Sequence, residues 1–187
     1  MNSHKQGPKS AAWLACAVVT WIGPVGIALA ATVDFQDYDV RSVFHIEKSH
    51  NRNQVHYGMH LTAACVPRTD APVYAYWHEL ERGPSVFLPL LAIEHQAYGI
   101  DSQRVQARVI TAGRVLVRLR ALPSRELAFE SYRDELRTCR ARVIAQIDGR
   151  RAILESVFAR VGALSVDSIR LQGKLFDGTA VREEIRR

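Results

Sequence analysis

Apolar and polar residues alternate with a period of two along most of the chain after residue 40, a pattern that predicts β-strands. Short runs rich in β-branched and aromatic residues, such as "SVFHIEK", "QVHYGMHL" and "VYAYWHEL", are bounded by Asn, Pro, Asp or Gly. The run "PLLAIEHQAYGI" fits either a short helix or a buried strand. We therefore expect an all-β fold: an antiparallel β-sandwich or barrel of about nine to ten strands, with one or two short helices.

Glycine-containing pairs separate alternating runs at three places in the second half of the chain: Ala112-Gly113, Asp148-Gly149 and Asp177-Gly178. Tight hairpin turns need positive φ, which glycine adopts readily, so each pair predicts a hairpin and the three together predict an antiparallel meander. The run "SRELAFESYRDELR" is predicted to be a strand that enters a loop or short helix, because Leu127 and Phe129 alternate with polar residues.

The run "FHIEKSHNRNQVHY", residues 44–57, predicts the first hairpin, with the Asn-rich cluster at 51–53 as its turn. If Phe44 and Ile46 face the core from one strand and Tyr57 from the next, the pairing must follow an odd-sum register. The opposite face then collects His45, Glu47, His56 and His60. Such a face could bind a divalent metal or supply an acid and a base. We favour the alternative, the ordinary solvated face of an antiparallel sheet.

Aromatic residues give weaker candidates for ligand binding. Tyr74, Tyr76 and His78 share one face of a predicted strand and Trp77 the other, so they could bind sugar or peptide or belong to the core. Tyr98 follows Glu94-His95 in a segment that suits the rim of a site. The chain has no P-loop, dinucleotide-binding glycine motif, nucleophile elbow or HExxH motif. We therefore assign no catalytic residue, metal or cofactor, and favour a role other than catalysis.

The first 30 residues have the organisation of a secretory signal. A short basic region precedes an apolar run interrupted by Gly23 and Pro24, and residues 28–30 read Ala-Leu-Ala. We expect cleavage near Ala31, then a polar leader over 31–40 and a single β-rich domain over 41–187. The protein is then periplasmic or secreted, without a mature transmembrane segment. A retained membrane anchor, or a lipoprotein anchor at Cys16, is the less favoured alternative.

Charge argues against a nucleic-acid partner. The formal charge is +6, but Lys5 and Lys9 lie in the predicted signal, which has no acid, so 23 basic and 19 acidic residues remain, or +4. The arginines are spread along the chain rather than clustered, which is not the footprint of a nucleic-acid surface.

Export also affects the cysteines. Cys16 is removed with the signal, which leaves Cys65 and Cys139. In an oxidising compartment this pair is a disulfide candidate. The alternative is two buried, reduced thiols.

Several motifs resemble a family of bacterial domains of unknown function. The most specific is the hairpin pattern at Phe44, Ile46, Lys48, Ser49, Asn51, Asn53, Val55 and Tyr57. "PVYAYW", "AYGI" and "LQGKLFDGTAVRE" extend the resemblance over most of the mature chain. The resemblance implies an exported β-rich domain and carries no activity, and the histidines are not part of its pattern.

Together these features predict an exported domain that acts as a binding or structural module of the cell envelope, with an envelope component or a small ligand as its partner. One alternative is a small envelope hydrolase or metal-binding protein that uses the His45, Glu47, His56 and His60 face. A barrel that carries a small apolar ligand is another.

Overall fold

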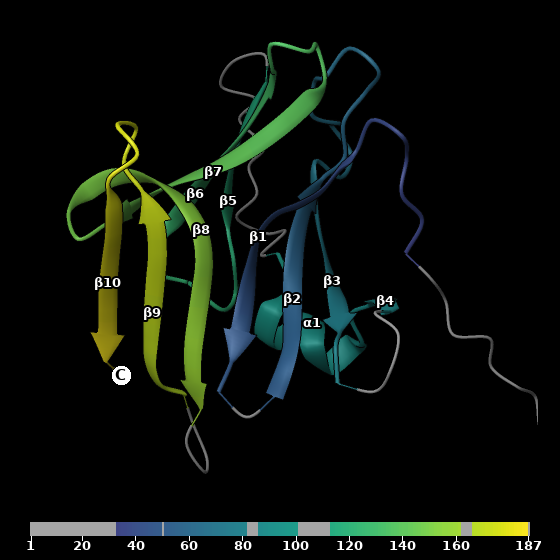
Figure 1. Cartoon of the computed structure of the whole chain (residues 1–187). Coiled ribbons are helices and arrows are strands. Elements are labelled where there is room, and N and C mark those ends of the chain that lie inside the picture. The colour runs from purple at the N-terminus through teal and green to yellow at the C-terminus, as the bar shows by residue number, and fades with distance from the viewer. Residues whose placement is uncertain (1–32, 50, 82–85, 101–112, 162–165, 187) are drawn as a thin grey trace, which may run out of the picture.

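The structure is a computed structural model that describes residues 33–49, 51–81, 86–100, 113–161 and 166–186. These residues form ten strands and one helix: β1 (Val40–Lys48), β2 (Asn51–Met59), β3 (Val73–Glu79), β4 (Val86–Pro89), α1 (Ala92–Tyr98), β5 (Arg114–Arg118), β6 (Glu126–Arg133), β7 (Cys139–Ile147), β8 (Arg150–Val161), β9 (Val166–Lys174) and β10 (Ala180–Arg186) (Figure 1). The all-β prediction is confirmed, and the ambiguous run after β4 contains the short helix.

All ten strands belong to one sheet, with the order β4-β3-β2-β1-β8-β7-β6-β5; β9 also pairs with β8, and β10 pairs with β9. The strands were expected to pair antiparallel throughout, yet β1 and β8 run parallel, with His45 opposite Ser156 and Lys48 opposite Ala159. The sheet is therefore mixed, which corrects the antiparallel prediction. Hairpin signals report only on strands adjacent in sequence, whereas β1 and β8 lie far apart in the chain and their pairing depends on the whole fold.

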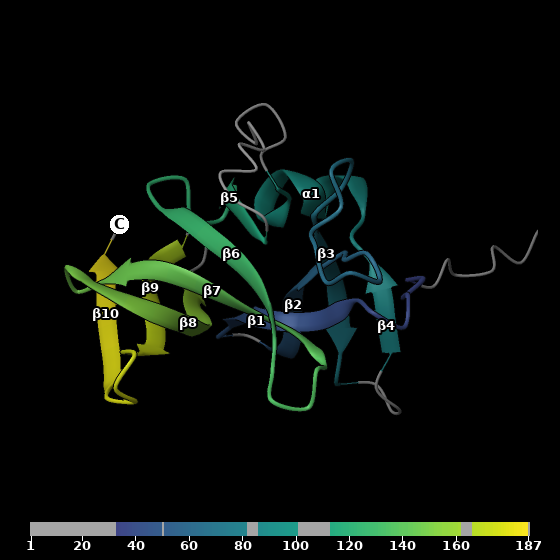
Figure 2. The ribbon, with the colours of Figure 1, turned by 90° about the horizontal axis from the view of Figure 1, so that it is seen from above.

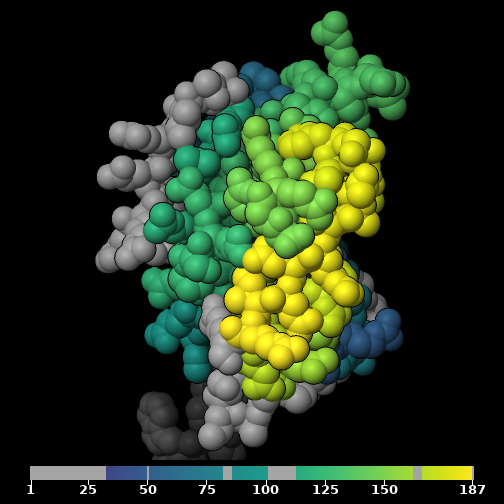
Figure 3. Space-filling model, turned by 90° about the vertical axis from the view of Figure 1, so that its left-hand side faces the viewer, coloured from purple at the N-terminus to yellow at the C-terminus, as the bar shows by residue number. Residues whose placement is uncertain are grey.

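Strand β8 is the point at which the sheet bends. Along one edge of β8, the first part of the strand pairs with β7 and the second part pairs with β1. Strand β9 pairs with the other edge of β8. The β1–β4 and β5–β7 flanks therefore diverge from β8, and their inner faces enclose the core (Figure 2). Phe44 of β1 and Phe129 of β6 meet there, with ring centroids 6.0 Å apart. Strand β10 is an edge strand of the sheet, beside β9. The C-terminal residues, in yellow, lie on the surface of the molecule (Figure 3).

Two of the three predicted glycine turns are confirmed. Asp148 and Gly149 have φ values of 52° and 69° between β7 and β8, and Gly178 has φ 87° between β9 and β10. The strand expected before Gly113 falls in residues 101–112, which lie outside the described residues. The run from Ser124 onward forms β6, as predicted.

The first hairpin has the predicted odd-sum register, with Phe44 opposite Tyr57 and Ile46 opposite Val55. All four side chains are buried in the core. The turn of the hairpin is not the predicted Asn-rich cluster, because residues 51–53 already belong to β2 and Asn51 pairs with Lys48. Helix α1 is attached to this core because the Tyr57 hydroxyl donates a hydrogen bond to the Tyr98 carbonyl at 2.7 Å. The fold thereby fixes α1 beside the inner face of the first hairpin.

The predicted signal, residues 1–30, lies outside the described residues. Within the described part of the chain, no helix has the length and hydrophobicity needed to span a membrane. The described part of the polar leader contacts the outer face of the sheet: the Phe35 ring lies 5.4 Å from that of Tyr76 and 6.0 Å from that of Tyr74. The leader therefore covers part of the face opposite the core.

Candidate functional site

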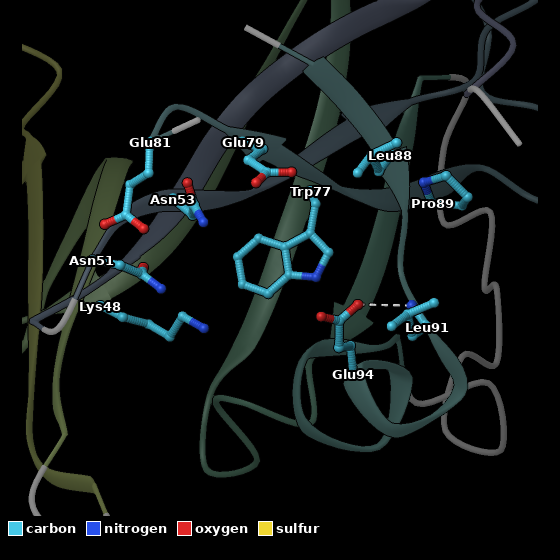
Figure 4. Close-up of a pocket in the computed structure, with 10 residues that line it drawn as sticks. All are labelled: Lys48, Asn51, Asn53, Trp77, Glu79, Glu81, Leu88, Pro89, Leu91 and Glu94. Atoms are coloured by element: carbon cyan, nitrogen blue, oxygen red, sulfur yellow. Dashed lines mark hydrogen bonds between the residues drawn. The ribbon is translucent and has the colours of Figure 1, made fainter. Parts of the chain in front are cut away.

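A pocket of about 570 Å³ lies between the turn end of the first hairpin, strand β3 and helix α1 (Figure 4). Its lining comprises one lysine, two asparagines, one tryptophan, three glutamates and an apolar wall: Lys48, Asn51, Asn53, Trp77, Glu79, Glu81, Glu94, Leu88, Pro89 and Leu91. We call it the Lys48–Trp77 pocket.

The strand alternation that builds the core also points these side chains into the pocket. Lys48 follows Phe44 and Ile46 on the inner face of β1, and Asn53 precedes Val55 on the inner face of β2. The β1–β2 register is irregular between Glu47 and Lys48, and such irregularities change the direction of a strand locally. The inner face thus changes from apolar to polar where the hairpin reaches its turn.

Lys48 lies over the aromatic rings of this region. Its Nζ atom is 4.4 Å from the Trp77 ring centroid and 5.6 Å from that of Tyr98, both within the range of a cation–π interaction. Burial lowers the pKa of Lys48, while the carboxylates of Glu94 and Glu81 oppose that change. The ammonium therefore lies over two aromatic rings and within the electrostatic influence of two carboxylates.

Backbone amides orient three of the polar side chains. Glu81 accepts a hydrogen bond from the Arg52 amide at 3.0 Å, and Glu94 accepts one from the Leu91 amide at 2.7 Å. The Asn53 Oδ1 atom accepts one from the Leu80 amide at 2.9 Å. Each of these contacts engages one atom of a side chain that has a second polar atom, so the groups are positioned but keep capacity to bind.

Two polar atoms of the pocket lining are buried without a hydrogen-bond partner among the described residues: Asn51 Oδ1 and Trp77 Nε1. A buried polar group left unpaired costs about 1–3 kcal/mol, and native structures contain few. One atom is an acceptor and the other a donor. A ligand with both functions would match them.

The histidines predicted as a possible site lie on the opposite face of the hairpin and bond mainly to one another. His45 Nε2 is 3.0 Å from Glu47 Oε1, and Gln54 links that carboxylate to His56 at 2.9 and 2.8 Å. His56 Nδ1 also lies 2.7 Å from the Ser42 hydroxyl. This network, which we call the histidine face, is partly buried rather than fully solvated.

Burial lowers the pKa of His56, and together with the neighbouring imidazoles of His45 and His78 it brings this pKa to about 4. His78 Nδ1 is 3.2 Å from His56 Nε2, and burial also lowers the pKa of His78. The His56 ring is therefore neutral at pH 7. A neutral imidazole in this network serves as a hydrogen-bonding group.

His60 does not join the other three candidates. Its Nδ1 atom pairs at 3.0 Å with Asp39, whose side chain is inaccessible to solvent, and its ring stacks on Tyr74 with centroids 4.1 Å apart. In the described ranges no group of three or more His, Cys, Asp or Glu side chains is placed to hold a metal ion.

The two tyrosine candidates differ in position. Tyr76 is buried on the outer face and donates a hydrogen bond to the Arg41 carbonyl at 2.8 Å. Tyr98 packs edge-on against Trp77, with centroids 5.9 Å apart, and so lies next to the pocket. Sequence reasoning did not select Lys48 or Asn51 as site residues, and it raised Trp77 only as an aromatic residue that could bind a ligand or belong to the core. Their signal was present, since all three belong to the motifs on which the family resemblance rests.

The two cysteines are brought together but are unbonded in the structure. The Cys65 thiol donates to the Tyr132 carbonyl at 3.4 Å. Burial, together with the nearby Cys139 side chain, raises the pKa of Cys65 to about 11. The disulfide itself stays a prediction.

These features define a class of protein: an all-β domain with a mixed sheet whose first hairpin ends in a polar and aromatic pocket. The chain belongs to the family described as Domain of unknown function (DUF4833), whose model matches residues 44–184. This confirms the resemblance to a family of unknown function, and the match includes every residue that lines the Lys48–Trp77 pocket. Neither a curated protein nor a solved structure matches the chain.

Proposed function

We propose that this protein is an exported binding module of the cell envelope that takes up a small ligand in the Lys48–Trp77 pocket. The observation that carries the proposal is the pair of buried atoms in the pocket lining, Asn51 Oδ1 and Trp77 Nε1, that lack partners among the described residues. The polar groups of the histidine face instead pair with one another. Unmet hydrogen-bonding capacity therefore favours the pocket as the ligand site.

Ligand binding in the pocket can be tested with a substitution that obstructs its entrance. Leu91 lines the pocket and is 65% exposed, so Leu91→Trp should obstruct the pocket with little effect on stability. A ligand at 100 times its Kd stabilises a protein by about 2.7 kcal/mol, which raises the Tm measurably. We expect a probe from a panel of neutral sugars, short peptides and small amines to raise the wild-type Tm, and Leu91→Trp to abolish that rise.

The matched control is Leu136→Trp. Leu136 is 83% exposed in the β6–β7 turn, at the opposite end of the molecule from α1 (Figure 1). This variant should respond to the probe as the wild type does. An equal response in the Leu91→Trp protein would show that the ligand binds elsewhere.

Export is supported by the basic, apolar and Ala-Leu-Ala succession of residues 1–30. When the full chain is expressed with its own N-terminus, we expect an extracytoplasmic product that begins near Ala31. N-terminal sequencing of the fractionated product checks this. Recovery of an intact Met1 in the membrane fraction would contradict export by a cleaved signal.

In the exported protein we expect a disulfide between Cys65 and Cys139. The fold places Cys139 near enough to Cys65 to affect its pKa, and an oxidising compartment favours their bridging. Mass spectrometry of the denatured, unreduced protein after alkylation should find both thiols blocked, and a Cys139→Ser variant should expose one alkylatable thiol. Two alkylated cysteines in the wild type would rule the bridge out.

A further inference from the structure

The charges in the Lys48–Trp77 pocket restrict the ligand that it can accept. Its lining has three carboxylates, from Glu79, Glu81 and Glu94, and one ammonium, from Lys48. Like charges brought together at a binding site cost several kcal/mol. A ligand with a carboxylate or phosphate is therefore disfavoured, which leaves neutral and cationic ligands.

The aromatic ring that would attract a cationic ligand already has a cation over it. Lys48 Nζ lies 4.4 Å from the Trp77 ring centroid, which is the position that a ligand ammonium would seek. A second cation there would be repelled by the first. The pocket is acidic as a whole, but its aromatic cation site is occupied by the protein's own side chain.

The polar groups of the lining match a ligand that both donates and accepts hydrogen bonds. The carboxylates only accept, the Lys48 ammonium and the Trp77 N–H only donate, and the two asparagine amides do both. A hydroxyl group is one donor and two acceptors, so several hydroxyls on one small ring can meet all of these groups. The apolar wall, Leu88, Pro89 and Leu91, faces the same space and suits the C–H surface of such a ring (Figure 4).

We propose that the Lys48–Trp77 pocket binds a neutral saccharide unit. The inference rests on the proposed function of this pocket and names the ligand class. The sugar packs its C–H surface against Trp77 and the apolar wall, receives hydrogen bonds from Lys48 and the asparagine amides, and donates hydroxyls to the glutamates. Asn51 Oδ1 and Trp77 Nε1 are closed to water in this arrangement of side chains, so sugar hydroxyls reach these two atoms only if neighbouring side chains move.

Tryptophan fluorescence gives a direct test, because the chain has three tryptophans and two of them, Trp13 and Trp21, lie in the predicted signal. In the full chain with Trp13→Phe and Trp21→Phe, all tryptophan emission comes from Trp77 in the pocket. The probes are glucose, N-acetylglucosamine and their disaccharides as neutral sugars, glucuronic acid as an anion, choline as a cation and trialanine as a peptide. We expect a saturable emission change with at least one neutral sugar, and binding of glucuronic acid at least about tenfold weaker than glucose.

Two variants test the roles of the charges. Lys48→Met keeps the apolar stem but removes the ammonium, and it should weaken sugar binding by about tenfold, the ratio that corresponds to one lost hydrogen bond. Lys174→Met, on the exposed surface of β9, is the matched control and should bind as the parent does. Glu81→Gln keeps the acceptor for the Arg52 amide but removes a negative charge. It should therefore reduce the ratio of the affinity for glucose to the affinity for glucuronic acid. A purely structural role of Glu81 would leave that ratio unchanged.

The remaining outcomes separate the two proposals. Binding of choline or trialanine without any neutral sugar would overturn the saccharide assignment and leave the pocket as a ligand site. A sugar response that is unchanged by Lys48→Met and Glu81→Gln would also overturn the assignment. Absence of a saturable response from every probe, in both emission and Tm, would overturn the pocket's binding function as well.

Discussion

Replacing Tyr57 by alanine is expected to lower the free energy of unfolding by about 3–5 kcal/mol, the range for large aromatic residues removed from a core. Tyr57 is fully buried and its ring stacks on Phe44, with centroids 4.7 Å apart and planes 4° from parallel. Truncation would leave a cavity between β1 and β2 and would break the hydrogen bond to the Tyr98 carbonyl. Denaturant titration, with the slope compared between variants, measures the loss.

Two control variants separate the contributions of the hydroxyl group and of core burial to the stability loss of Tyr57→Ala. Tyr57→Phe keeps the ring and removes the hydroxyl, which leaves the Tyr98 carbonyl without its donor and should cost about 1–3 kcal/mol. Tyr132→Ala truncates a 43% exposed tyrosine of β6 and should cost well under half as much as Tyr57→Ala. A loss below about 1 kcal/mol for Tyr57→Ala would contradict the core position of this residue.

Acidification is expected to destabilise the protein through His56. An unfolded histidine takes up its proton near pH 6.5, whereas burial holds the pKa of folded His56 at about 4. Between these values the unfolded state binds more protons than the folded state, so stability falls as the pH decreases from about 6.5 to 4. The stability contributed by a neutral His56 is complete above this window, and its loss by pH 4 is on the order of 2–3 kcal/mol.

Comparing the pH dependence of stability of a His56→Gln variant with that of the wild type shows whether His56 causes this loss. His56→Gln preserves hydrogen-bonding atoms and cannot titrate, so its stability should fall less between pH 7 and pH 4 than that of the wild type. The lowered pKa of His78 acts in the same direction as that of His56 and is present in both proteins, so the comparison isolates His56. Parallel pH profiles of unfolding free energy for the two proteins would show that His56 does not carry the effect.

Much of the local structure could be predicted because it depends on neighbouring residues. Alternation at Phe44, Ile46 and Tyr57 fixed the faces of the first two strands and their odd-sum register, since a slip by one residue would expose the apolar set. Asp148-Gly149 specified its turn because both residues must take positive φ. The family motif was readable in the same way, as a spacing of residue types.

The site was less accessible to such reasoning. The histidines were the more conspicuous candidates because they cluster within one hairpin, whereas the pocket combines residues from β1, β2, β3 and α1. Alternation indicated correctly that Trp77 and Tyr76 lie on opposite faces of β3, but not that Trp77 would meet Lys48 and Tyr98. That meeting depends on where α1 attaches to the core.

By itself, then, the sequence determined the all-β class, the first hairpin with its register, two glycine turns and the family motif. Only the tertiary structure decided the parallel pairing of β1 with β8, the proximity of Cys65 and Cys139, the separation of His60 from the other histidines and the assembly of the Lys48–Trp77 pocket. The physical reason is the range of the forces involved. Steric limits on φ and the burial of alternate side chains act within a few residues, whereas the choice among distant strands depends on which arrangement buries the whole apolar set at once.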